Sequence, residues 1–122
     1  MIGYMTLGTN DLPRACTFYD ALLEPLGVRS MEPNDRIRLY RSKGGQGMLG
    51  IAKPFDGTTA SVGNGTMVAI PVESRDLVDT LHAKALALGG ADEGAPGLRG
   101  ESFYGGYFRD LDGNKLVFFK VG

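Results

Sequence analysis

The sequence predicts an α+β fold made of two βαβββ modules, because one apolar pattern occurs twice. A strand-like run at 4–9 leads into a helix-like run ending at Gly27, and a run at 67–72 leads into another ending at Gly90. The two copies lie about half a chain apart, and 122 residues suit one compact domain. We therefore expect a single domain over 1–122, with module one at 1–53, a linker at 54–65 and module two at 66–122.

The composition predicts an ordinary globular protein. Hydrophobic residues make up 43% and charged residues 22% of the chain. A net charge of −1 gives no basic footprint for nucleic acid. Cys16 is the only cysteine, so no intrachain disulfide can form and a cytoplasmic location is expected. The N-terminus does not resemble a signal peptide, and no apolar run is long enough to span a membrane.

The first module begins with alternating residues at 2–9 that predict a strand. Asn10-Asp11 offers an N-cap for the following helix, Pro13 fits its first turn, and Gly27 ends it. Its apolar positions recur at helical spacing: Leu12, Ala15, Cys16, Tyr19, Leu22, Leu23 and Leu26. Three short strands are then expected, at 28–31, 36–41 and 48–53, with a hairpin loop at 42–47 between the last two.

The second module repeats this order. A strand at 66–72 precedes a helix that Ser74 would cap and that Gly89-Gly90 would end. A loop is expected at 94–102. Strands at 103–109 and 115–121 would then flank a turn at 110–114, where Asp-Gly supplies the positive φ that a tight hairpin needs.

The segment 104–116, YGGYFRDLDGNKL, resembles the closing hairpin of the vicinal oxygen chelate superfamily, which includes glyoxalase I, bleomycin resistance proteins and extradiol dioxygenases. The segment 12–20, LPRACTFYD, resembles the first helix of the same family. The resemblance covers essentially the whole chain. It implies U-shaped sheets with the helices on their convex faces, a ligand on the concave face, and a homodimer.

Enzymes of that superfamily hold a divalent metal through side chains on the first and last strands of each module. Carried onto this chain, the positions fall on Tyr4, Met67 and Val117, and near Leu49. Divalent metals of this kind prefer carboxylate or imidazole ligands, so we expect no metal site and no cofactor. The only histidine, His82, lies on the second helix and away from the expected pocket.

Strand alternation predicts which side chains line that pocket. One face of each strand should be apolar and pack on a helix, as Met5, Leu7, Ile37, Leu39, Val68, Ile70, Leu116 and Phe118 allow. The other face would then hold the candidate ligand pocket: Tyr4, Thr6, Arg38, Tyr40, Leu49, Met67, Tyr107, Val117 and Phe119. Such a lining suits an organic ligand. An inward Arg38 would bind a carboxylate or phosphate group, whereas the alternative places Arg36 and Arg38 on a solvated face.

Other reactive or aromatic residues have structural explanations. Most aromatic side chains fit the core, with Tyr4 the preferred pocket residue. His82 is expected to be structural, and Cys16 to be an inert thiol on the apolar stripe of its helix. The glycines at 44–47 indicate a hairpin rather than a phosphate loop, because no helix follows them.

Three functions follow from these patterns. The first is a metal-independent protein that binds a small organic ligand, an anion if Arg38 faces the pocket, akin to the bleomycin resistance branch. The alternative is a glyoxalase-like lyase, isomerase or dioxygenase with an atypical site. A third is an accessory module that acts only as a partner subunit. No catalytic residue is assigned, and neither a nucleic acid nor a membrane is an expected partner.

Overall fold

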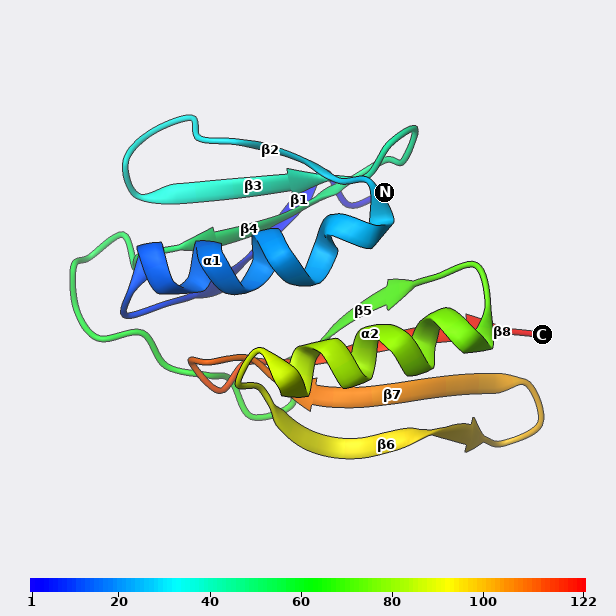
Figure 1. Cartoon of the computed structure of the whole chain (residues 1–122). Coiled ribbons are helices and arrows are strands. Elements are labelled where there is room, and N and C mark those ends of the chain that lie inside the picture. Colours follow the sequence, from blue (N-terminus) through cyan, green and yellow to red (C-terminus); the bar gives the residue numbers. More distant parts are fainter. The chain divides into compact units, whose positions relative to one another are not determined.

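Each half of the chain folds into the predicted βαβββ pattern (Figure 1). The structure is a computed structural model that describes residues 1–122. The chain divides into two compact units, Met1–Val62 and Gly63–Gly122. The boundary between the units falls inside the predicted linker at 54–65.

The first unit contains four strands and one α-helix. Strand β1 spans Tyr4–Gly8 and helix α1 spans Leu12–Leu23, followed by a short 3-10 turn, η1, at Glu24–Leu26. The remaining strands are β2 at Arg29–Met31, β3 at Ile37–Arg41 and β4 at Met48–Ala52. Their order across the sheet is β1-β4-β3-β2, with β1 parallel to β4 and the other pairs antiparallel.

The second unit repeats this topology. Strand β5 spans Val68–Pro71 and helix α2 spans Arg75–Ala87. Strands β6, β7 and β8 follow at Ala91–Arg99, Phe103–Arg109 and Lys115–Val121. The order β5-β8-β7-β6, with β5 parallel to β8, matches the first sheet strand for strand. The repeat predicted from apolar spacing is therefore a repeat of structure.

Local chemistry fixes the starts of both helices at the predicted places. Asp11 caps α1 by accepting a 3.1 Å hydrogen bond from the backbone N–H of Arg14, and Ser74 caps α2 by accepting one of 3.0 Å from Leu77. Helix α1 itself ends at Leu23, and Gly27 ends the 3-10 turn η1 that follows it: Gly27 has a left-handed φ of 66°, and its N–H donates to the carbonyl of Glu24.

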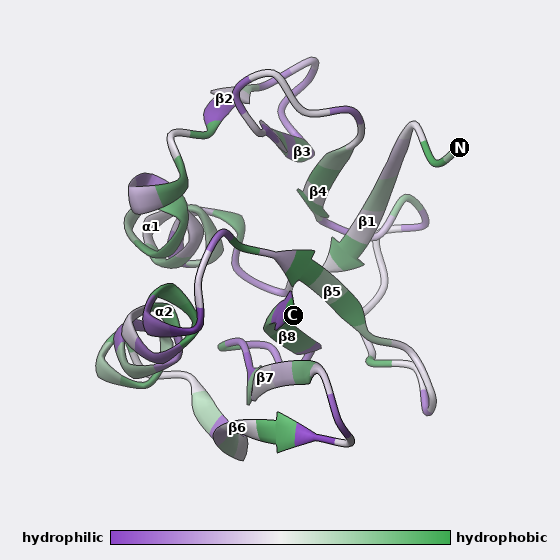
Figure 2. Ribbon diagram, turned by 90° about the vertical axis from the view of Figure 1, so that its right-hand side faces the viewer, coloured by the Kyte–Doolittle hydropathy of each residue, from purple (hydrophilic) through white to green (hydrophobic).

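The buried side chains of each unit come from one stripe of its helix and from the strands. The stripe of α1 consists of Ala15, Phe18, Tyr19, Leu22 and Leu23. That of α2 consists of Val78, Leu81, His82 and Ala85. Figure 2 shows that β4 and β5 are hydrophobic almost throughout. The cores follow the helical and strand periods of the sequence.

The loop predicted at 94–102 is wrong. Residues Ala91–Arg99 form β6, which pairs with β7 as the edge strand of the second sheet. Gly94, Pro96 and Gly97 suggested a loop, but the pairing register shifts between Asp92 and Gly97, so these residues sit at irregularities. An edge strand tolerates proline and bulges because one of its sides pairs with no neighbour in the sheet.

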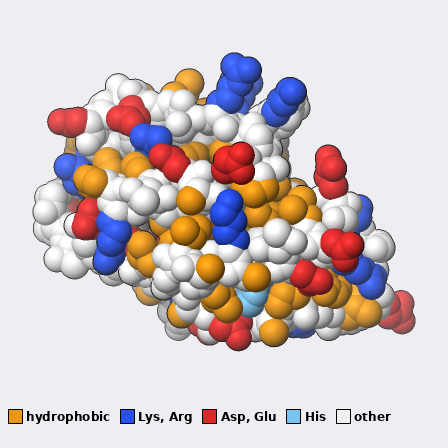
Figure 3. Space-filling view, viewed as in Figure 1, with side chains coloured by type: hydrophobic (Ala, Val, Ile, Leu, Met, Phe, Trp, Pro, Cys, Tyr) orange, Lys and Arg blue, Asp and Glu red, His pale blue; other side chains and the backbone are white.

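Neither helix is long and apolar enough to cross a membrane. On the face seen in Figure 3, acidic and basic side chains are interspersed, and no continuous basic stripe appears there. This distribution agrees with the nearly balanced charge of the chain.

Candidate functional site

The face of the first sheet that lies away from α1, called the opposite face below, is defined by the packing around Gly50. Thr6, Gly50 and Leu39 are in register across β1, β4 and β3. A Cβ atom on Gly50 would lie 3.0 Å from Leu39 Cδ2, 3.1 Å from Thr6 Cγ2 and 3.2 Å from Ile37 Cδ1. Thr6, Ile37 and Leu39 therefore share the opposite face, and Ile37 and Leu39 cluster there with Ala52.

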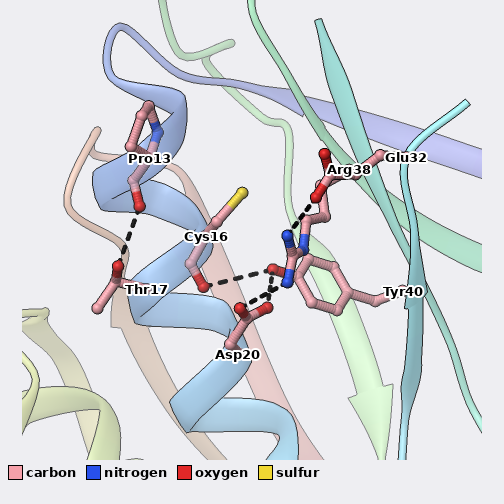
Figure 4. Close-up of polar contacts among 7 residues, drawn as sticks. All are labelled: Pro13, Cys16, Thr17, Asp20, Glu32, Arg38 and Tyr40. Atoms are coloured by element: carbon pink, nitrogen blue, oxygen red, sulfur yellow. Dashed lines mark hydrogen bonds and ion pairs between the residues drawn. The ribbon is translucent and has the colours of Figure 1, made fainter. Parts of the chain in front are cut away.

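The expected orientation of β3 is therefore wrong. Ile37 and Leu39 were predicted to pack on the helix, with Arg38 and Tyr40 in the pocket. Instead, Arg38 Nη2 lies 2.7 Å from Asp20 Oδ2, and the Tyr40 hydroxyl donates a 2.7 Å hydrogen bond to Asp20 Oδ1 (Figure 4). Asp20 belongs to α1, so Arg38 and Tyr40 face the helix.

Leu49 is also misplaced by the prediction. It pairs in register with Met5 on one side and with Tyr40 on the other, so it lies on the helix face with Tyr40. The helix face of the first sheet thus carries a polar cluster, Asp20, Glu32, Arg38 and Tyr40, beside its apolar core. The prediction assumed that the more apolar face of β3 packs on the helix. It is wrong because Asp20 of α1 points to the sheet and binds Arg38 and Tyr40.

Electrostatics stabilise this cluster in its present protonation state. Burial and the hydrogen bond to Asp20 raise the pKa of Tyr40 well above its usual value, so the phenol stays neutral. Burial is the largest single influence on the pKa of Arg38 and lowers it, but the charge and hydrogen bond of Asp20, together with Tyr40 and Cys16, outweigh burial, and the net shift is upward. Burial raises the pKa of the nearby Cys16 thiol. The cluster therefore ties α1 to β3.

The faces of the second sheet agree with the prediction. Tyr104 donates a 2.6 Å hydrogen bond to Asp79 of α2, and a Cβ on Gly106 would lie 3.2 Å from His82 Cβ. Alternate residues of β7 therefore face α2, and by register so do Leu116 and Phe118 of β8 and Val68 and Ile70 of β5.

The predicted pocket residues of this unit lie on the other face, where Phe103 and Phe119 stack with ring centroids 5.0 Å apart. Tyr107 lies there with Arg99 and Lys115 near its ring, at 5.4 and 5.5 Å from its centroid. Val117 has no exposed surface. Met67 lies directly before β5 and is exposed. Contact of these residues with a ligand stays a prediction.

His82 is held as a structural side chain. It is 5% exposed, and its Nε2 lies 3.1 Å from Asp92 Oδ1 and 3.0 Å from the carbonyl oxygen of Tyr107. Both partners are acceptors, so this nitrogen carries a hydrogen and donates. The ring thereby joins α2 to β6 and β7 on the helix face.

The first unit contains a cleft, and the sequence predicted only one of the residues that line it. It lies at the end of the sheet where β1 and β4 end and β3 begins, and has a volume of about 430 Å³, within the usual range for small-molecule sites. Of the predicted pocket residues only Thr6 lines it. Arg36, Lys53 and Phe55 also line it and were missed, because residues 54–65 were predicted only as a linker between the modules.

The donor set does not fit the metal site that the family resemblance implies. Tyr4 is exposed on β1, while Met67 and Val117 offer no hard ligand. Leu49 faces the helix, and its neighbours on the opposite face are Met48 and Gly50. Within either unit, no three His, Cys, Asp or Glu side chains come together closely enough to hold a metal ion. No chemical step is therefore derived through a metal.

Solved structures with the same fold are numerous. A glyoxalase/bleomycin resistance protein from Albidiferax ferrireducens T118 is 36% identical, with a TM-score of 0.91 and coverage of 100% of this chain and 99% of that chain. A glyoxalase/bleomycin resistance protein/dioxygenase family enzyme from Burkholderia phytofirmans PsJN is 18% identical, with a TM-score of 0.78 and 98% of each chain covered. The second likeness shows the fold alone.

A glyoxalase-related enzyme from Fulvimarina pelagi is 23% identical, with a TM-score of 0.76, covering 98% of this chain and 87% of that chain. No curated protein sequence matches the chain. The family model of the Glyoxalase/Bleomycin resistance protein/Dioxygenase superfamily matches residues 1–118. The repeated βαβββ topology and this match agree, and the chain belongs to the Glyoxalase/Bleomycin resistance protein/Dioxygenase superfamily.

Proposed function

We propose that this protein binds a small organic molecule without a metal ion, on the opposite face of the first sheet and in the cleft that continues from it. The observation that carries the proposal is the cleft at Thr6, which combines apolar walls with cationic and hydroxyl side chains. A lining of this kind recognises an organic ligand by shape and by a few directed hydrogen bonds.

The absence of suitable donors at the family's metal positions supports the metal-independent form of the proposal. Tyr4 can donate a hydrogen bond to a ligand oxygen. The polar residues near α1 are engaged with one another. These features favour sequestration of a ligand over its chemical conversion.

The single family model over 1–118 supports treating both units as one domain. The predicted pocket residues of the second unit, Tyr107 and Phe119, stay part of the proposed ligand surface. A homodimer in the cytoplasm completes the proposal, supported by the family resemblance and by the lone Cys16. Light scattering after size-exclusion chromatography tests the dimer directly.

A thermal-shift screen of small organic molecules, run beside a metal analysis of the purified protein, tests the proposed function. A ligand that binds only the folded chain stabilises it by about 2.7 kcal/mol at a concentration of 100 times its Kd. We expect at least one compound to raise Tm equally before and after treatment with a chelator. Stoichiometric nickel, zinc or iron, with an activity lost on chelation, would instead support the lyase, isomerase or dioxygenase alternative.

A further inference from the structure

We propose that the cleft at the end of the first sheet selects a small organic carboxylate, whose oxygens are bound by Arg36 and Lys53 and whose apolar part lies against Phe55. This inference rests on the proposed function, because it assigns a ligand class to the same cleft. It moves the anion-binding role from Arg38, which α1 engages, to a cation two residues earlier.

The walls of the cleft are fixed by specific contacts. Asn10 Oδ1 accepts a 2.6 Å hydrogen bond from the N–H of Ala60, and its Nδ2 lies 3.5 Å from the Ala60 carbonyl oxygen. A Cβ on Gly8 would lie 3.0 Å from Ala60 Cβ, so the connection packs closely on the end of β1. Gly57 closes a turn by donating to the carbonyl of Pro54. The residues after β4 therefore form an ordered wall of the cleft.

Hydrogen bonds join Arg36 to the backbone of Lys53, and both residues line the cleft. The N–H of Lys53 donates to the Arg36 carbonyl at 2.9 Å, and Arg36 Nη1 donates back to the Lys53 carbonyl at 2.9 Å. This contact orients the guanidinium and leaves its other donors available. Neither cation forms an ion pair with a carboxylate. An oxyanion bound by both side chains would accept charge-assisted hydrogen bonds from them.

The one acidic side chain in the lining does not neutralise these cations. Asp56 Oδ1 accepts hydrogen bonds from the backbone N–H of Thr58 at 2.9 Å and from its hydroxyl at 2.8 Å. These bonds lower the pKa of Asp56, and they direct its carboxylate to Thr58 in the turn that forms the wall. The charged lining of two cations and one anion keeps an excess of positive charge. Hydroxyls of Thr6, Thr59 and Ser61 add further donors.

Phe55 supplies the apolar part of the recognition. Its side chain is 89% exposed although it borders the cleft, and Arg36 Cζ lies 5.3 Å from its ring centroid. A carboxylate at Arg36 would therefore bring the rest of its molecule next to an aromatic ring that is otherwise in water. Covering that ring makes binding more favourable through the hydrophobic effect and through ring stacking.

Benzoate and its neutral isostere benzamide are suitable probes, because they share shape and differ in charge. Titrations of the full chain, followed by two-dimensional amide NMR, report both affinity and location. We expect benzoate to shift the amide signals of 53 and 55–60, with an affinity at least about fivefold higher than that of benzamide. Raising the salt concentration should weaken the binding of benzoate and leave that of benzamide unchanged, because salt screens only the interaction of charged groups.

The double variant Arg36→Gln/Lys53→Gln removes both charges and keeps a polar amide at each position. We expect it to weaken benzoate at least about tenfold, as the loss of charge-assisted hydrogen bonds predicts. Arg41→Gln/Lys43→Gln is the matched control, since it removes two exposed cations from the other end of the sheet. Phe55→Ala should also weaken benzoate, and it should fold normally because the side chain is exposed.

Equal affinity for benzoate and benzamide, or equal loss in the double variant and its control, would overturn the assignment. So would binding of inorganic phosphate in the cleft without any binding of benzoate. Failure of the carboxylate assignment can be distinguished from failure of the proposed function. A neutral compound that binds elsewhere on the opposite face, with no benzoate in the cleft, would leave ligand binding intact and remove only the carboxylate assignment.

Discussion

Asp20 and Tyr40 connect the first helix to its sheet through one short hydrogen bond. The Tyr40 hydroxyl lies 2.7 Å from Asp20 Oδ1, while Arg38 occupies the other carboxylate oxygen at the same distance. Tyr40 is 3% exposed, whereas the Asp20 side chain is 44% exposed. The carboxylate thus satisfies a buried donor from a position that water can still reach, which reduces the cost of holding its charge there.

Replacing Asp20 with alanine should lower the free energy of unfolding by about 1–3 kcal/mol, because it leaves the buried Tyr40 hydroxyl only its longer, 3.5 Å contact with the Cys16 carbonyl. Urea unfolding followed by circular dichroism measures the loss. Asp20→Asn keeps one acceptor oxygen and should lose less. Glu24→Ala removes an exposed carboxylate near the same helix end and serves as the control. An equal loss in Asp20→Ala and Glu24→Ala would contradict the assigned role.

Alkaline pH should destabilise the wild-type chain more than Tyr40→Phe. The pKa of Tyr40 is raised in the folded state, so between the unfolded value near 10 and the folded value the folded chain holds a proton that the unfolded chain has lost. The stabilising contribution is therefore complete below about pH 10 and declines above it. Urea midpoints at pH 8 and 10.5 for both proteins give the comparison. Parallel declines would show that Tyr40 titrates normally.

Cys16 should react slowly with thiol reagents in the folded protein. Burial raises its pKa, and only the thiolate is an effective nucleophile. We expect the second-order rate constant with a disulfide reagent at pH 7.5 to be lower in the native chain than in urea. A native rate that equals or exceeds the unfolded rate would indicate an activated thiol and would remove its assignment as inert.

Gly106→Ala should cost about 1–3 kcal/mol of stability, because an added methyl would lie 3.0 Å from Pro96 Cγ and 3.2 Å from His82 Cβ. The new atom would push α2 away from β7. Gly3→Ala is the matched control, since a Cβ there meets nothing within 4 Å. Thermal unfolding of the two variants measures the difference, and equal Tm values would mean that α2 packs less closely on β7 than the structure has it.

Most of the fold was predictable because it follows from local chemistry. The helix caps at Asp11 and Ser74 and the turn at Gly113 depend on residue types that are visible in the sequence. Strand β6 was missed because its glycines and proline are compatible with an edge strand as well as with a loop. Tertiary pairing with β7, which no local pattern encodes, decides between the two.

The candidate site was less predictable because alternation gives only the relative phase of a strand. A strand with Ile37 and Leu39 on one face and Arg38 and Tyr40 on the other can pack on a helix in either orientation. The orientation of β3 follows from the position of Asp20 on the sheet-facing side of α1, which forms hydrogen bonds with residues far away in the sequence. In the second unit both α2 and the alternation favour the same face, and the expected orientation was right.

Native mass spectrometry of the protein purified without added ligand, before and after treatment with a chelator, tests the central claim most directly. It resolves bound metal and bound organic molecules by their mass in one measurement. The proposed function predicts an organic adduct that persists after chelation, with no stoichiometric metal. A stoichiometric metal whose removal also releases the organic adduct would contradict metal-independent binding.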